Sequence, residues 1–307
     1  MAGSSARSSD RRPPSSATLG RSVRIAVLVI VLAVGAAIGT EFALSSSSGL
    51  KGTVKEDSFA SKAVRGRLRF AIYLPPGYGR GGRYPVIYYL HGLPATGSAY
   101  RAFGFVPATL EVRRLRSIVV APQGARDGDS DPEYLDWGPG RNWETAIAEE
   151  LPAYVDAHYR TIRGRTGRAL IGVSAGGYGA FLLTLHHLSS FAVVESWSGY
   201  FHPTNPEGTE PLELGSAEAD AHASAHTLVS DLRQAVRRYP TLLAFYIGTG
   251  DERFEAENVR LGQELTAAKV PHVFRLYPGA HMQSLWQREA GPWLKLALGQ
   301  LHPATER

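Results

Sequence analysis

Short apolar runs alternate along this chain with stretches of helical period from about residue 66 onward. The runs are rich in β-branched or aromatic residues and bounded by Gly, Pro or charge, as buried strands are. They are Leu68–Leu74, Val86–Leu90, Ile118–Ala121, Ala169–Val173, Ala192–Trp197, Leu242–Ile247 and Val273–Tyr277. The helical stretches between them are Trp143–His158, Gly177–His187, Leu228–Tyr239, Glu257–Lys269 and Ser284–Leu298. This alternation predicts an α/β fold with a mostly parallel, twisted sheet of about eight strands and helices on both faces.

The N-terminal part follows a different pattern. Residues 1–20 are rich in Ser, Arg and Pro, which predicts a disordered basic segment. Within residues 21–43, an uncharged apolar run from Ile25 to Gly39 predicts a hydrophobic helix, either a transmembrane anchor or a signal sequence. Five arginines precede the run, so we expect the N-terminus to stay in the cytoplasm.

A Ser/Gly linker, residues 44–51, separates this helix from one catalytic domain expected over residues 52–301. The charge balance supports the division. Of the net charge of +5, the residues before Ile25 account for +4, which leaves +1 for the rest. The basic character is therefore a topology signal, and we expect no nucleic-acid partner. The chain has no cysteine, which excludes disulfides and thiolate metal sites.

A nucleophile motif follows the run that ends at Val173. The sequence Gly172-Val173-Ser174-Ala175-Gly176 is G-x-S-x-G, with a predicted strand before it and an apolar helix after it. In this context the serine sits on a tight turn that lifts its hydroxyl clear of the sheet, and small neighbours let strand and helix approach closely. Ser174 is therefore the candidate nucleophile.

A serine nucleophile needs a base and an acid, in the chain order Ser…Asp/Glu…His. His281 follows the last predicted strand and is the expected base. Asp251 follows the preceding strand and is the expected acid, with Glu252 and Glu255 as neighbouring alternatives and Glu195 as a more distant one. His186 and His187 lie along a helix and are expected to be ordinary helix residues.

Acyl transfer also needs two N–H donors aimed at an oxyanion. The backbone N–H of Ala175, directly after the nucleophile, is one candidate, and that of Leu93 in the turn after Val86–Leu90 is the other. His91 is expected to brace this turn. Residues 200–230 are expected to form a small lid, with Phe201, His202 and Leu212 as candidate substrate-contacting residues.

Two further motifs fail on inspection. Asp127–Asp131 begins like a calcium loop, but Pro132 stands where that loop needs Gly. Gly79-Arg80-Gly81-Gly82 precedes a strand, so it is not a phosphate loop. We therefore expect no cofactor and no metal.

With these residues in view, the chain resembles the esterase family of the α/β-hydrolase superfamily. That family includes S-formylglutathione hydrolases, enterochelin esterases, feruloyl esterases and mycolyltransferases. The stretches that carry the resemblance are YLPPGY (73–78), YPVIYYLHGL (84–93), NWETAIAEELPAYVDAHYR (142–160), GVSAGGYGA (172–180), GTGDERF (248–254) and PGAHMQSLW (278–286). The resemblance implies a triad of Ser174, Asp251 and His281 with Leu93 and Ala175 as oxyanion donors.

The block around Trp143 is most similar to the mycolyltransferases, and Trp143 is a candidate substrate contact. The Ala-Gly-Gly after Ser174 departs from them and favours hydrolysis. We therefore expect an exported serine esterase that acts on a small-molecule or lipid or glycan ester, anchored in the cell membrane or secreted. An envelope acyltransferase and a catalytically inactive ligand-binding homologue are the alternatives. The acyl and alcohol groups and the oligomeric state stay open.

Overall fold

Eight strands form one sheet in this computed structural model, which describes residues 51–129, 133–205 and 210–305. The strands are β1 (Thr53–Ser61), β2 (Gly66–Leu74), β3 (Val86–Leu90), β4 (Ile118–Pro122), β5 (Arg168–Val173), β6 (Val193–Trp197), β7 (Leu242–Gly248) and β8 (Val273–Tyr277). Their order across the sheet is β1-β2-β4-β3-β5-β6-β7-β8. Strands β3 to β8 run parallel to one another, and β2 is antiparallel to both β1 and β4. The predicted mostly parallel sheet is confirmed.

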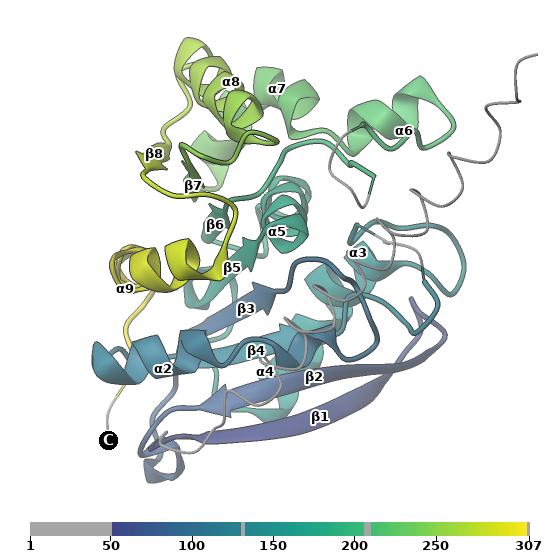
Figure 1. The fold of residues 1–307 in the computed structure, drawn as a ribbon. Helices are drawn as coiled ribbons and strands as arrows, with labels where there is room; N and C mark the ends of the chain where they lie inside the picture. Colours follow the sequence, from purple (N-terminus) through teal and green to yellow (C-terminus); the bar gives the residue numbers. More distant parts are fainter. Residues whose placement is uncertain (1–50, 130–132, 206–209, 306–307) are drawn as a thin grey trace, which may run out of the picture. The chain divides into compact units, whose positions relative to one another are not determined.

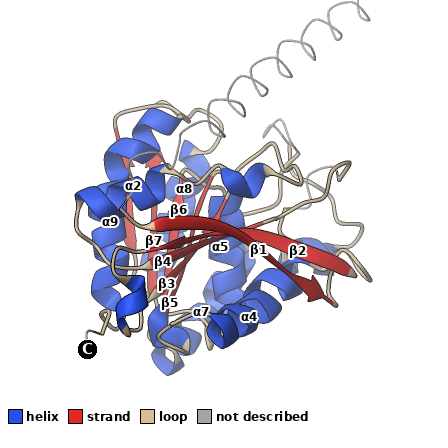
Figure 2. Ribbon diagram, turned by 90° about the horizontal axis from the view of Figure 1, so that it is seen from below, coloured by secondary structure: helices blue, strands red, loops and turns tan. Residues whose placement is uncertain are grey.

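Helices cover both faces of this sheet (Figures 1 and 2). One face is covered by α2 (Phe105–Val112) and α9 (Gln283–Gln300), and the other by α4 (Leu151–His158), α5 (Ala175–His186), α7 (Ala225–Arg238) and α8 (Glu255–Ala267). The central strands β3 and β4 are buried along their whole length. Burial on both faces explains why these strands read as continuous apolar runs in the sequence.

The first strand, β1, was not predicted. It lies at the edge of the sheet, is largely exposed, and carries the charged residues Lys55, Glu56 and Asp57. Such an edge strand has no apolar run because solvent reaches it, so the pattern that identified the inner strands is absent.

The single helix predicted over Trp143–His158 is divided. It begins as α3 (Trp143–Thr145), continues as a five-residue π-helical segment, Ala146–Glu150, and ends as α4. Pro152, which lacks an N–H, is the second residue of α4, just after the π-helical segment. Two short helices, α2 and α6 (Ala217–His222), were also not predicted.

The carboxyl ends of the parallel strands position the site. Ser174 follows β5, Asp251 is the third residue after β7, and His281 follows β8 in the turn before α9. Because these strands are parallel, their ends meet at one edge of the sheet, where ligands of α/β proteins bind.

The predicted basic segment 1–20, the apolar segment 21–43 and all but the last residue of the linker 44–51 lie outside the described residues. Among the helices in the described part of the chain, none combines the length and apolar character needed to cross a bilayer.

Candidate active site

Ser174 occupies a strained turn between β5 and α5. Its φ and ψ angles are 54° and −125°, in a region that L-residues rarely adopt. The turn is possible because the residues two positions before and after Ser174, Gly172 and Gly176, have no side chain. A Cβ on Gly172 would lie 2.0 Å from the carbonyl oxygen of Gly176, and one on Gly176 would lie 2.1 Å from that of Leu90. The glycines of the motif thus let strand and helix close around the serine.

His281 lies between Ser174 and Asp251. Its Nε2 is 2.9 Å from Oγ of Ser174, and its Nδ1 is 2.5 Å from Oδ2 of Asp251. The Asp251 side chain is 1% exposed and that of His281 is 15% exposed. A buried carboxylate needs a partner, and here it fixes the tautomer: Nδ1–H donates to Asp251, which leaves the Nε2 lone pair facing the Ser174 hydroxyl.

The alternative acids lie elsewhere. Glu252 is exposed, and Glu255 is the first residue of α8. Glu195 is fully buried in β6, where it accepts a hydrogen bond from Nε1 of Trp197 at 3.0 Å. Burial raises the pKa of Glu195 well above its usual value, which favours the neutral form.

The turn after β3 lies against the nucleophile. A Cβ on Gly92 would lie 3.0 Å from Cβ of Ser174, so the backbone that leads into Leu93 passes directly beside the serine. Ala175 is the first residue of α5, and N–H groups in a first helical turn have no acceptor within the helix. Both predicted oxyanion donors therefore belong to backbone segments adjoining Ser174.

His91 is buried behind this turn. Its Nδ1 lies 2.8 Å from the carbonyl oxygen of Gly92, and its own carbonyl accepts a 2.6 Å hydrogen bond from the Tyr134 hydroxyl. Burial lowers the pKa of His91 to about 4, so its ring is neutral near pH 7. These contacts agree with a bracing role.

The structure does not bring the predicted substrate contacts to the serine. Trp143 is 1% exposed and Phe201 is fully buried, and both pack in the hydrophobic core between the sheet and its helices. His202 is half-buried and hydrogen-bonds through Nδ1 to Oε1 of Glu257 at 2.6 Å. Large aromatic side chains beside a motif are more often core than binding residues, and that rule explains Trp143 and Phe201.

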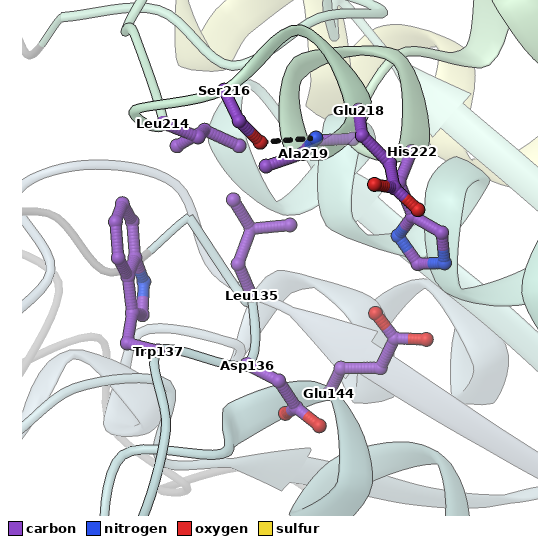
Figure 3. A pocket seen from close by; sticks show the side chains of 10 residues that line it. Leu135, Asp136, Trp137, Glu144, Leu214, Ser216, Glu218, Ala219 and His222 are labelled. Atoms are coloured by element: carbon purple, nitrogen blue, oxygen red, sulfur yellow. Dashed lines mark hydrogen bonds between the residues drawn. The ribbon is translucent and has the colours of Figure 1, made fainter.

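A cavity of about 510 Å³ lies between α6 with its preceding loop and the segment before α3 (Figure 3). Its apolar lining residues are Leu135, Trp137, Leu214, Ala219 and Ala223, and its polar ones are Asp136, Glu144, Ser216, Glu218 and His222. None of the triad candidates lines it. However, Leu135 and Ala223 share one apolar cluster with Ala175, and Leu93, Trp137 and Leu214 pack against that cluster. The cavity walls therefore adjoin the segments that carry the predicted oxyanion donors.

Glu144 forms one end of the cavity and holds two histidines. Its Oε1 lies 2.8 Å from Nδ1 of His186 and 2.9 Å from Nε2 of His187. Burial alone would raise the pKa of Glu144, but the hydrogen bonds from both imidazoles hold it at about 2. The two histidines are thus not ordinary helix residues, because they fix a charged wall of the cavity.

Sequence reasoning missed this cavity. Its walls come from residues 135–144 and 214–223, which are far apart in the chain and carry no shared motif.

Three comparisons with known proteins bear on this geometry. An esterase of Mycobacterium tuberculosis (strain H37Rv) is 35% identical over 147 residues, which are 46% of this chain and 31% of the relative, so the chain spans about a third of that protein's length. A diacylglycerol acyltransferase/mycolyltransferase of Mycobacterium leprae is 34% identical over 83 residues, 27% of this chain and 24% of the relative.

Among solved structures, an S-formylglutathione hydrolase from Agrobacterium tumefaciens superposes with a TM-score of 0.68 at 21% identity, over 84% of this chain and 99% of that one. At this identity the likeness shows the α/β-hydrolase fold alone. The sequence profile of the family described as "Putative esterase" matches residues 61–290, about three quarters of the sequence, and the chain belongs to this esterase family.

Proposed function

We propose that this chain is an exported serine carboxylic-ester hydrolase that acts through Ser174, Asp251 and His281. The observation that carries the proposal is the pair of hydrogen bonds through His281, 2.9 Å to Ser174 and 2.5 Å to Asp251. A hydroxyl, a correctly oriented imidazole and a buried carboxylate in this order are what nucleophilic acyl transfer requires.

The proposed reaction has two steps. His281 takes the proton of Ser174 at Nε2 as Oγ attacks the ester carbonyl, and then gives that proton to the departing alcohol as the acyl-enzyme forms. Water next loses a proton to the same nitrogen and attacks the acyl carbonyl. The bond from the acyl carbon to Ser174 Oγ breaks, the carboxylic acid leaves, and His281 gives the proton back to Oγ to restore the hydroxyl. Asp251 stabilises the imidazolium that forms in each step.

Stabilisation of the negative charge that develops on the carbonyl oxygen is assigned to the backbone N–H groups of Leu93 and Ala175. Both belong to segments that adjoin Ser174, and Ala175 lies at the N-terminus of α5, where the helix dipole favours an anion. Rigid donors of this kind usually supply the largest share of stabilisation in acyl transfer.

The cavity lined by Leu135, Trp137 and Leu214 is the proposed site for one part of the ester. Its apolar side suits an acyl chain or a sugar face. Its carboxylates, Asp136, Glu144 and Glu218, disfavour an anionic group there. An uncharged lipid or glycan ester fits these walls best.

Export is proposed from the sequence of residues 21–43 and the arginines before it. In cells that produce the full chain, protease added outside intact cells should then degrade the domain containing Ser174. Resistance of the domain until the cells are lysed would contradict export.

Acyl transfer to a sugar is the second candidate, because the similar Mycobacterium leprae protein is named a mycolyltransferase.

The test of both candidates uses the purified full chain with p-nitrophenyl acetate, butyrate and octanoate, with and without trehalose, beside Ser174→Ala. Hydrolysis predicts free acid as the main product and no turnover by the variant. Acyl-trehalose forming faster than free acid would favour transfer. Turnover that survives in Ser174→Ala, or a folded wild-type protein without turnover, would contradict the proposed hydrolase, and the second result would favour a ligand-binding homologue.

A further inference from the structure

Two histidines and a glutamate converge where the loop after β6 meets α7 and α8. They are His202 in that loop, His226 in the first turn of α7 and Glu257 in the first turn of α8. One ligand atom from each lies within 4.8 Å of the other two. His226 and Glu257 are largely buried, with side chains 8% and 13% exposed. The cluster is separate from the proposed triad and takes no part in the proposed reaction.

The atoms of this cluster are arranged around one oxygen. Glu257 Oε1 lies 2.6 Å from Nδ1 of His202 and 3.4 Å from Nε2 of His226. Ligand atoms of a tetrahedral zinc site, at 2.0–2.1 Å from the metal, are about 3.3 Å apart. The His226 pair already has that spacing. The His202 pair is at hydrogen-bond distance, and this side chain, 32% exposed, can move outward by the remaining ~0.7 Å.

A fourth residue orients the buried histidine. Nδ1 of His226 lies 2.6 Å from Oε2 of Glu264, two helical turns beyond Glu257 on α8. This bond directs Nδ1–H at Glu264 and leaves Nε2, which faces Glu257, as the nitrogen that would bind a metal. Metal-binding histidines almost always donate their other ring N–H to a carboxylate, a backbone carbonyl or a water.

We propose that His202 Nδ1, His226 Nε2 and Glu257 bind a divalent transition-metal ion, Zn²⁺. Glu264 orients the His226 ring through its hydrogen bond to Nδ1. Imidazole and carboxylate donors suit this ion, and a water would complete the tetrahedron. The sequence led us to expect no metal, because the three ligands are spread over residues 202–257 and form no motif. The metal would clip the loop after β6 to α8, which follows the turn that carries Asp251.

Metal content of the full chain, purified with its affinity tag removed and dialysed against low-metal buffer after loading with ZnSO₄, tests this site. We expect about one zinc per chain and a rise in Tm of at least about 5 °C when free zinc exceeds its Kd about 100-fold. His226→Gln and Glu257→Gln should lose bound zinc and the Tm shift, and Glu264→Gln should bind at least about tenfold more weakly.

Two controls keep this test specific. His158→Gln removes an exposed histidine, and His281→Gln removes the histidine paired with the buried Asp251; both variants should retain zinc. Far-UV circular dichroism of each variant checks that it is folded. A zinc-free wild type, zinc retained by folded His226→Gln and Glu257→Gln, or zinc lost in His281→Gln would overturn the proposal. None of these measurements depends on ester hydrolysis.

Discussion

Nδ1 of His281 lies 2.5 Å from Oδ2 of Asp251, although the two residues follow different strands and are thirty positions apart in the chain. Asp251 is almost completely buried, and its side chain holds the imidazole of His281 in one orientation through this hydrogen bond. We expect Asp251→Asn to lower kcat for p-nitrophenyl butyrate by roughly 10³- to 10⁴-fold, because an amide would favour the wrong tautomer. Steady-state kinetics measure the loss.

Glu252→Gln provides the matched control for that variant, since Glu252 is the neighbouring acid and is exposed. Its kcat should stay within about twofold of wild type. A large loss of kcat in Glu252→Gln with little loss in Asp251→Asn would show that Glu252, and not Asp251, is the triad acid.

The contact between Gly92 and Ser174 gives a second prediction. A methyl group on residue 92 would lie 3.0 Å from Cβ of Ser174 and 3.1 Å from the Val173 carbonyl oxygen, so the turn must shift. We expect Gly92→Ala to lower kcat on the order of 10- to 100-fold through misplacement of the Leu93 N–H, with KM little changed. Gly79→Ala, where a Cβ meets nothing within 4 Å, should behave as wild type. Equal rates for the two variants would argue against Leu93 as a donor.

The cavity beneath α6 can be narrowed from one side. Ala219 lines it, whereas Ala217 on the same helix is exposed and does not. We expect Ala219→Phe to lower kcat/KM for p-nitrophenyl octanoate by about tenfold, with acetate within about twofold. Ala217→Phe should change neither. If Ala219→Phe treats both esters alike, the cavity does not hold the acyl chain.

Glu195 predicts a pH dependence of stability. Its folded-state pKa is raised by burial, so the folded protein holds a proton that the unfolded chain releases above about pH 4.5. The stability of the wild type should therefore fall, relative to Glu195→Gln, as pH rises from 5 towards 8, by up to about 1.4 kcal/mol per pH unit. Urea denaturation of both proteins at pH 5 and pH 8 measures this. A difference that stays constant with pH would show that Glu195 ionises normally.

Much of the fold could be predicted because the inner strands are buried on both faces. Burial demands continuous apolar runs such as Val86–Leu90, and those runs are visible in the sequence. The edge strand β1 has no such demand, and the winding change at Ala146–Glu150 lies inside a stretch whose sequence pattern reads as one helix. The local sequence pattern therefore identifies strands that are buried in the core and misses a strand that solvent reaches.

The residues of the candidate site also fall into those that the sequence predicted and those that it did not. Ser174, Asp251 and His281 lie at strand ends, so order along the chain was enough to place them at one edge of the sheet. The cavity walls and the His202–His226–Glu257 cluster depend on how loops and helices pack against each other. The sequence predicted that Trp143 and Phe201 contact the substrate, but both side chains are buried in the hydrophobic core. Spatial neighbours without a shared motif needed the structure.

The central claim is that Ser174 is the nucleophile, and intact-protein mass spectrometry tests it most directly. The full chain and Ser174→Ala are each treated with a fluorophosphonate, and the labelled peptide is mapped, with circular dichroism to confirm folding. The account predicts one adduct per wild-type chain, on Ser174, and none on the variant. A folded wild-type protein that takes no label, or a Ser174→Ala protein labelled to the same extent, would contradict it.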